Sequence, residues 1–324
     1  MSIATMLIIL AISFIVSVIL GPIIIPLLRR FKFGQSIREE GPKSHMKKAG
    51  TPTMGGVIFL FSIIVTTVIM SLVKGAFTSQ TIILVLVLIG FGVVGFLDDG
   101  LKIIFKRNLG LTSLQKLIAQ IVISIAAYFL LKMGTFHNTV QIPFTDFAIH
   151  LGLAYVLFLV FWLVGFSNAV NLTDGLDGLV SGTASIAFAA YGVLALLNDQ
   201  LDVAIFAFAV VGALLGFLIF NANPAKVFMG DTGSLALGGA LAMLSILVGQ
   251  ELLLLLIGII FVLETLSVMM QVTSFKLTGK RIFKMSPLHH HFELSGWSEW
   301  RIVLTFWLTA LVAALIAVVP EVLQ

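Results

Sequence analysis

Long apolar runs recur from one end of the chain to the other, and they constrain the fold more than any other feature of the sequence. A helix needs about 20 consecutive, mostly apolar residues to cross the hydrocarbon core of a bilayer. Ten runs of suitable length occur, at 3–28, 53–73, 80–97, 113–133, 151–170, 179–197, 201–220, 234–249, 252–275 and 302–319. The chain is therefore expected to be an all-α, polytopic membrane protein with about ten transmembrane helices.

The composition leaves little room for another class of fold. Hydrophobic residues make up 59% of the chain and charged residues 10%, whereas soluble domains carry about 25% charged residues. No polar stretch is long enough to fold on its own, so residues 1–324 are expected to form a single membrane domain. The least certain boundary separates the eighth and ninth runs at Gly249, Gln250 and Glu251. These two runs together hold about 40 residues, too many for one crossing.

Basic residues gather in alternate loops. Ten spans place successive loops on opposite sides of the membrane, and of the 19 Lys and Arg residues all but Lys74 and Lys132 fall in or beside the odd-numbered loops. The positive-inside rule assigns that side to the cytoplasm and leaves both termini outside. Many of the basic residues in the first loop can be explained by this topology and by attraction to anionic lipid. On the outer side, residues 139–150 alternate apolar and polar side chains and are expected to form a small β-hairpin.

Two adjacent carboxylates, Asp98 and Asp99, end the third run in the sequence GFLDDG. They repel each other and lose water at the membrane boundary, so something should compensate them. Mg²⁺ is commonly bound by one or two carboxylates together with substrate phosphates, which makes the pair a candidate metal site. The alternative is a solvated helix end, although two acids at a helix C-terminus oppose the helix dipole. Because the chain has no cysteine, oxygen or imidazole would have to hold any metal.

Amide and carboxylate side chains recur every three residues in the segment NAVNLTDGLDG, which follows the fifth run. If the segment is helical, this spacing places them along one side. The four residues are Asn168, Asn171, Asp174 and Asp177. The segment contains no Lys or Arg, so it is suited to oxygen ligation or to hydrogen bonding of a sugar or base. The alternative is a capped turn between two spans, since Asn, Asp and Gly also favour turns.

A further acid, Asp231, lies in the sequence NPAKVFMGDTGS after the seventh run. Asp231 or Thr232 could simply cap the eighth helix. A helix start also attracts anions, and Lys226 beside it adds a charge suited to phosphate. The residues by themselves leave both interpretations open.

Three consecutive histidines, His289, His290 and His291, lie in the ninth loop. Adjacent histidines cannot share one helix face, so they form a poor zinc cage. One or two of them could contact phosphate or transfer protons, or all three could simply be solvated. Glu264 is a separate problem, because it lies inside the ninth run. An acid there is costly in a bilayer and should have a partner in protein or water.

Seven segments resemble the phospho-N-acetylmuramoyl-pentapeptide transferase family, within the superfamily of polyprenyl-phosphate sugar-1-phosphate transferases. They are FGQSIREEGPKSH, KKAGTPTMGG, GFLDDG, KRNLGLTSLQK, NAVNLTDGLDG, NPAKVFMGDTGS and GKRIFKMSPLHHHFELSGWSE. The Asp pair and the Asn/Asp segment are shared across the superfamily, whereas the first-loop and histidine segments are similar to this family in particular. The resemblance implies the ten-helix architecture of the family. Gly100 departs from the pattern, because the family commonly has an aromatic residue after the Asp pair, and this could alter packing and substrate fit.

The resemblance implies transfer of phospho-N-acetylmuramoyl-pentapeptide from its UDP carrier to undecaprenyl phosphate, with Mg²⁺ as cofactor and UMP and lipid I as products. The reaction would occur at the cytoplasmic face of the bacterial cell membrane. By motif, it implies an acidic catalytic and metal-binding cluster of Asp98, Asp99 and Asp231, in which Asp231 is the strongest candidate ligand and Asp98 deprotonates the lipid phosphate. The resemblance also implies catalytic positions at Lys43 and His289 and substrate-binding positions at Lys102, Asn168, Asn171, Asp174, Asp177 and His290.

Other functions remain to be compared with this one. A sister transferase of N-acetylglucosamine-1-phosphate would share the Mg²⁺ chemistry. A secondary transporter should carry polar residues near the bilayer midplane, yet the spans hold hardly any charge apart from Glu264, and a structural scaffold would not need the acidic and amide residues of the loops. The expected partners are UDP-N-acetylmuramoyl-pentapeptide, undecaprenyl phosphate and the lipid bilayer, with no nucleic acid and, by resemblance alone, a second copy in a homodimer. Direct attack and a covalent aspartyl-phosphate intermediate both stay open.

Overall fold

The computed structural model describes residues 2–30, 50–105, 110–134, 136, 138–145 and 147–323. Within these residues, ten helices are long and apolar enough to cross a membrane. They are α1 (Ile3–Arg30), α2 (Gly56–Val73), α3 (Ser79–Ile104), α4 (Ser113–Lys132), α5 (Tyr155–Thr173), α6 (Leu179–Leu197), α7 (Leu201–Asn221), α8 (Gly230–Val248), α10 (Ile259–Thr278) and α12 (Glu299–Leu323). The shorter elements are β1 (Thr139–Gln141), β2 (Ala148–His150), the 3₁₀ helix η2 (Gly152–Ala154), α9 (Leu254–Ile257) and α11 (Leu288–Glu293). The predicted fold class, an all-α membrane protein with a small β-hairpin, is confirmed.

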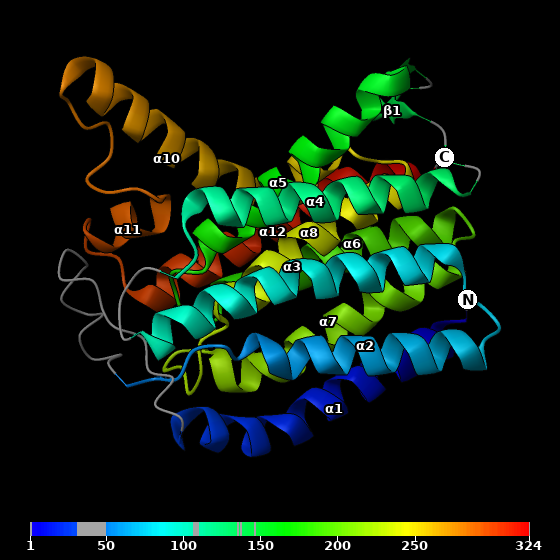
Figure 1. The fold of residues 1–324 in the computed structure, drawn as a ribbon, viewed down its shortest axis with the longest axis horizontal. Coiled ribbons are helices and arrows are strands. Elements are labelled where there is room, and N and C mark those ends of the chain that lie inside the picture. The colour runs from blue at the N-terminus through cyan, green and yellow to red at the C-terminus, as the bar shows by residue number, and fades with distance from the viewer. Residues whose placement is uncertain are drawn as a thin grey trace.

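The long helices form one bundle, from which α10 leans away at one end (Figure 1). Both termini lie at the end that carries the β-hairpin, and α11 lies at the opposite end. An even number of crossings produces this arrangement, in agreement with the expectation that the termini share a side. The assignment of that side to the outside of a cell stays a prediction.

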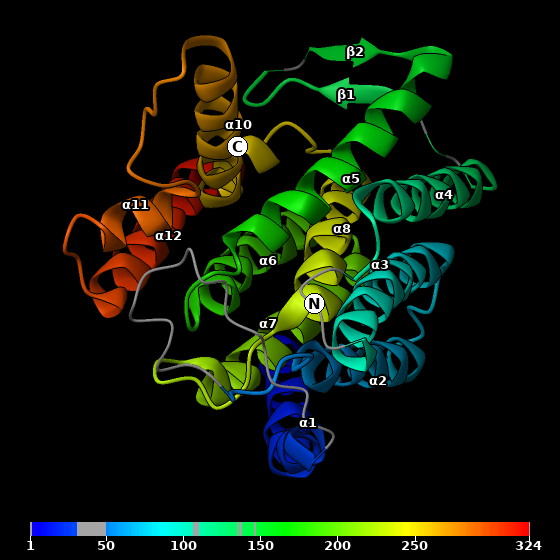
Figure 2. The same cartoon turned by 60° about the vertical axis from the view of Figure 1, so that its left-hand side comes forward.

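Helix α8 lies at the centre of the bundle and packs against α3 and α5 (Figure 2). Helices in lipid associate through close packing of small residues rather than through the hydrophobic effect. An ideal Cβ built on Gly95 of α3 would lie 2.0 Å from the backbone oxygen of Asp231 in α8. On the other side, a Cβ on Gly238 of α8 would lie 2.3 Å from the backbone oxygen of Phe166 in α5. Glycine therefore permits the close approach that brings the ends of α3 and α8 together.

Helix α1 packs on α7 in the same way. Gly212 and Gly216 lie one helical turn apart, and ideal Cβ atoms on them would lie 2.3 and 2.6 Å from the backbone oxygens of Leu10 and Phe14. The close approach lets the Ser13 hydroxyl on α1 donate a hydrogen bond of 2.6 Å to the backbone oxygen of α7 at position 209. The α1–α7 contact thus encloses its polar groups within protein rather than exposing them to lipid.

The uncertain boundary between the eighth and ninth runs is a true helix end. Helix α8 stops at Val248, and Gly249 adopts the left-handed conformation with φ 74°. Helices often end in this way, because glycine has no Cβ to oppose a positive φ. The next apolar run was expected to be one helix, but it is divided at Gly258 into α9 and α10. The separation into two spans is confirmed, and α10 is the ninth span.

The predicted hairpin is also confirmed. Strands β1 and β2 pair in antiparallel fashion, with Val140 opposite Ile149. Nearby, the Tyr155 hydroxyl at the start of α5 donates a hydrogen bond of 2.7 Å to Glu251 Oε1, in the turn between α8 and α9. Glu251 is buried, and the loss of water raises its pKa. These contacts lie at the opposite end of the bundle from α11.

Candidate active site

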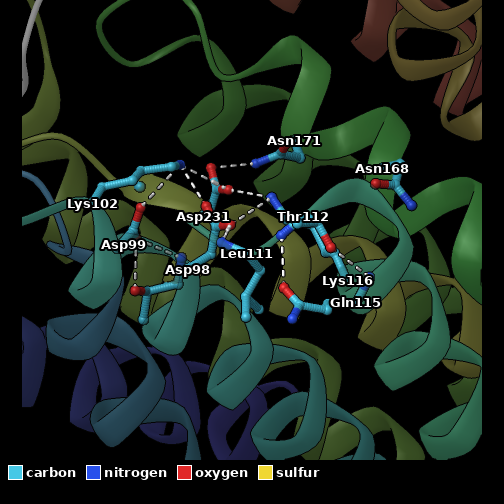
Figure 3. Close-up of polar contacts among 12 residues, drawn as sticks. Asp98, Asp99, Lys102, Leu111, Thr112, Gln115, Lys116, Asn168, Asn171 and Asp231 are labelled. Carbon is cyan, nitrogen blue, oxygen red and sulfur yellow. Dashed lines mark hydrogen bonds and ion pairs between the residues drawn. The ribbon is translucent and has the colours of Figure 1, made fainter. Parts of the chain in front are cut away.

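Three carboxylates from two distant parts of the sequence meet at one end of the bundle (Figure 3). Asp98 and Asp99 lie near the end of α3, and Asp231 lies in the first turn of α8. One oxygen from each carboxylate lies within 4.8 Å of the others. The Asp pair is buried and Asp231 is half-buried. The structure thus brings together the three acids of the predicted cluster, and their oxygens suit a hard divalent cation such as Mg²⁺.

Two lysines neutralise most of this negative charge. Lys102 follows the Asp pair by one helical turn, and its Nζ lies 2.5 Å from Asp98 Oδ2 and 3.2 Å from Asp231 Oδ2. Lys116 approaches from α4, with its Nζ 2.8 Å from Asp231 Oδ2 and 3.3 Å from Asp98 Oδ1. Three carboxylates and two ammonium groups leave a formal charge of −1. A divalent cation would reverse the sign of this charge, and the site would then attract phosphate groups.

Asp99 also accepts hydrogen bonds from the first turn of α8. The backbone N–H of Thr232 donates a hydrogen bond of 2.9 Å to Asp99 Oδ2, and the Thr232 hydroxyl donates one of 2.8 Å to the same oxygen. The residue at the N-cap position of α8 is Met229, which makes no side-chain capping bond. Capping by Asp231 or Thr232, one of the alternatives from the sequence, is therefore wrong. A carboxylate from α3 takes that role, and the Asp231 carboxylate contacts the two lysines and Asn171.

Two amide side chains of α5, Asn171 and Asn168, have different hydrogen-bond partners. Asn171 Nδ2 donates hydrogen bonds of 2.9 Å to Asp231 Oδ1 and to Ser234 Oγ, so it fixes the orientation of the half-buried carboxylate. Asn168 lies one turn earlier and to one side of the cluster (Figure 3), where its Nδ2 donates to Gln120 Oε1 of α4 at 2.9 Å. The predicted helical spacing is confirmed for these two residues, but only Asn171 contacts the acids.

The spacing of three does not continue to Asp177, because α5 ends at Thr173. Asp177 Oδ2 accepts hydrogen bonds of 3.0 Å from Asn223 Nδ2 and from the backbone N–H of residue 225. Its own backbone N–H donates to Glu299 Oε1 at 2.8 Å. Asp177 therefore connects the loop after α5 to the loop after α7 and to the start of α12 instead of contacting the acidic cluster. Asp174 remains near the cluster, and the loss of water, together with the charges of Asp231 and Asp99, raises its pKa to about 8.

The three histidines have three different partners. His289 is buried and contacts Glu264 of α10. His290 Nδ1 lies 2.8 Å from Glu293 Oε2. His291 Nδ1 accepts a hydrogen bond of 3.1 Å from the backbone N–H of Lys284. Among the described residues, the group that is compact enough to share a metal ion is the acidic cluster.

Sequence reasoning missed three groups at this site and named one that the structure does not describe. Lys116 was considered only for topology, and the N–H of Leu111, which donates to Asp98 Oδ1 at 2.9 Å, was not considered. Thr232 was considered only as a cap. Lys116 and Leu111 lie in the segment KRNLGLTSLQK, so the resemblance itself was the signal that could have found them. Lys43 lies outside the described residues.

Gly100, the departure from the family pattern, lies beside the Asp pair in open space. An ideal Cβ on this residue meets no atom of the described residues within 4 Å. A larger residue at this position would therefore begin without a steric clash.

Two family models match the chain. The model of glycosyl transferase family 4 covers residues 81–249, and signature 1 of phospho-N-acetylmuramoyl-pentapeptide-transferase covers residues 48–60. The first match contains all three acids and both lysines of the site. The second includes the residues that immediately precede α2.

Curated relatives match nearly the whole chain. A protein from Geobacillus sp. (strain WCH70) is 62% identical over 310 residues, which is 96% of each chain. A Bacillus subtilis (strain 168) protein is 61% identical over 310 residues, again 96% of each chain. A Bacillus mycoides (strain KBAB4) protein is 60% identical over 307 residues, or 95% of each chain. All three are called phospho-N-acetylmuramoyl-pentapeptide-transferase.

Proposed function

Because this chain belongs to the phospho-N-acetylmuramoyl-pentapeptide-transferase family, we propose that it transfers phospho-N-acetylmuramoyl-pentapeptide from a UDP carrier to undecaprenyl phosphate. The products are UMP and lipid I, the first lipid-linked precursor of peptidoglycan. The observation that carries the proposal is the cluster of three carboxylates and two lysines at one end of a membrane bundle. A reaction between two anionic phosphates needs positive charge to offset their repulsion. A lipid acceptor requires the site to lie at the boundary of the membrane.

Mg²⁺ is the cofactor that the donor set fits best. Hard divalent cations prefer oxygen ligands, and Mg²⁺ usually shares one or two carboxylates with substrate phosphates. Asp231 is the best ligand candidate, because it is half-buried and its two oxygens face different partners, Asn171 and the lysines. Asp98 and Asp99 complete the set. When bound, the ion supplies positive charge that neutralises the phosphate groups of the donor.

The other side chains of the site have separate roles in the proposed reaction. Over the whole reaction, an oxygen of the lipid phosphate becomes bonded to the phosphorus that bears the sugar, and the bond from that phosphorus to the oxygen of UMP breaks. Lys102 and Lys116 reduce the repulsion between the two phosphates. Asp98 accepts the proton from the fraction of the lipid phosphate that is still protonated, which leaves the attacking oxygen fully ionised. Asn171 keeps Asp231 in a fixed orientation through the 2.9 Å hydrogen bond.

The site faces the cytoplasm of a bacterial cell in this proposal. Nearly all of the Lys and Arg residues belong to the loops on its side of the bundle, as the positive-inside rule requires of a cytoplasmic face. Nucleotide-activated sugars are also made and used in the cytoplasm. We extend the proposal to a homodimer on the basis of family membership.

An assay with purified protein in lipid nanodiscs tests the function. The expected result is release of UMP and formation of lipid I from UDP-N-acetylmuramoyl-pentapeptide, undecaprenyl phosphate and Mg²⁺, with neither product formed when the lipid acceptor is left out. UDP-N-acetylglucosamine serves as the competing donor, because the sister transferase would use it. Turnover with that donor alone, or no turnover by folded protein, would refute the assignment.

A further inference from the structure

Glu264 is an acid inside a membrane helix, and its partner is the first histidine of the ninth loop. The Glu264 side chain on α10 is 0% exposed and that of His289 on α11 is 1% exposed. Glu264 Oε1 accepts a hydrogen bond of 3.2 Å from the backbone N–H of His289 and lies 3.3 Å from its Nδ1. Since a buried ionisable side chain is costly in a bilayer, its contact with a predicted catalytic residue requires an explanation.

The other ring nitrogen of His289 faces the loop that follows α5. An ideal Cβ on Gly175 would lie 2.2 Å from His289 Nε2 and 2.8 Å from Cε1, so the imidazole lies directly against the glycine. Gly175 does not have a positive φ, which means that the backbone itself would accept an alanine. Glycine is therefore needed here for the space that the ring occupies. The imidazole is held between Glu264 on one side and the Asp174–Gly175 loop on the other.

A structural role accounts for only part of this arrangement: Glu264 Oε1 satisfies the N–H of His289 in the first turn of α11, but a backbone hydrogen bond does not require an imidazole at that position. Buried ionisable pairs can often be replaced by apolar side chains without loss of stability, so burial alone gives no reason for an acid and an imidazole here. Within the described residues, neither ring nitrogen of His289 makes a hydrogen bond; Nδ1 has the 3.3 Å contact with Glu264, whereas Nε2 has no polar partner. It lies beside the loop that carries Asp174, next to the acidic cluster. A buried polar atom without a partner calls for an explanation, and a bound ligand group would supply the missing partner.

We propose that Glu264 is a positioning residue, which holds the imidazole of His289 by its Nδ1 side so that Nε2 is presented to a phosphate group of the substrate. This inference rests on the proposed function, because it assumes a phosphorylated substrate beside the acidic cluster. Gly175 is part of the same arrangement, because the absence of a side chain there leaves space for the imidazole ring of His289. The pair also couples α10, the helix that leans away from the bundle, to the site.

Four variants in nanodiscs test the proposal through turnover, donor KM and thermal unfolding. Glu264→Gln keeps the size of the side chain and removes its charge, while Glu264→Asp keeps the charge at a shorter reach. Gly175→Ala displaces the ring without touching Glu264. Gly165→Ala, on α5, is the matched control, because an added Cβ there meets no atom within 4 Å in the part of the chain that the structure describes.

The expected result separates positioning from stability. Loss of an orienting partner typically costs about 10- to 100-fold, so Glu264→Gln and Gly175→Ala should lower kcat by that factor. The donor KM should stay within about twofold of wild type, and Glu264→Asp should recover part of kcat. Gly165→Ala should behave as wild type. In a His289→Asn background, Glu264→Gln should cause no further loss, because it acts through the ring.

Three outcomes would overturn the inference. They are a kcat for Glu264→Gln within twofold of wild type, a loss that tracks a fall in the unfolding temperature, and an effect of the same size in the His289→Asn background. Each of them leaves the proposed function intact if the wild type forms lipid I. A wild type that forms no lipid product would remove both proposals.

Discussion

Replacement of Lys116 by methionine tests whether the cations of the site act in the reaction. The Lys116 Nζ lies 2.8 Å from Asp231 Oδ2 and 3.3 Å from Asp98 Oδ1, and the side chain is 20% exposed. Coulomb's law gives about 4 kcal/mol or more for each such contact at an effective dielectric constant of about 20. With substrate bound, Lys116 would attract the substrate phosphates as well as the two carboxylates. Lys102 would still supply positive charge in the variant, so only part of the Coulomb energy would be lost. We therefore expect a net loss of about 3 kcal/mol in the transition state, or about 100-fold in kcat/KM.

The assay is initial-rate formation of lipid I at saturating Mg²⁺, with Lys132→Met as the control. Lys132 lies on the same helix at the opposite end and is exposed, so the same substitution there should change kcat/KM by less than twofold. Lys116→Arg keeps the charge and should retain more activity than Lys116→Met. If Lys116→Met stays within about fivefold of wild type, the electrostatic role derived from the two distances is wrong.

Three further predictions concern the metal and the packing. Asp231→Asn should abolish turnover while the protein still folds and inserts, and near-normal turnover would remove Asp231 from the metal site. EDTA should stop the reaction, and added Mg²⁺ should restore it. Mg²⁺ should also raise the unfolding temperature of the wild type but not that of Asp231→Asn. An equal rise in both proteins would place the ion elsewhere. Gly95→Ala should lower the free energy of unfolding by about 1–3 kcal/mol, because the added Cβ would lie 2.0 Å from a backbone oxygen of α8. Gly100→Ala, on the same helix in open space, should not do so, and equal unfolding temperatures for the two variants would contradict the packing account.

The sequence by itself determined the class of fold and the kinds of chemical group at the site. Transfer of an apolar run into a bilayer depends on local composition and length, so ten spans could be found without any tertiary information. The position of Gly249 marked a helix end for an equally local reason. The predicted cluster of Asp98, Asp99 and Asp231 came from motifs and from the family resemblance.

Only the tertiary structure decided which of these groups meet. Lys116 forms an ion pair with Asp231 because α4 packs beside α3, and spacing in the sequence does not predict that contact. Asp177 turns away from the acids because α5 ends four residues earlier, at Thr173.

Two further placements depend on contacts between distant segments. Glu264 on α10 meets His289 because α11, the next helix along the chain, packs back against α10. The acidic cluster itself forms because Gly95 lets α3 approach the backbone of α8. Side-chain chemistry is a property of the residue and can be recognised in the sequence, whereas the distance between two charges depends on helix packing, which small residues on separate helices determine together.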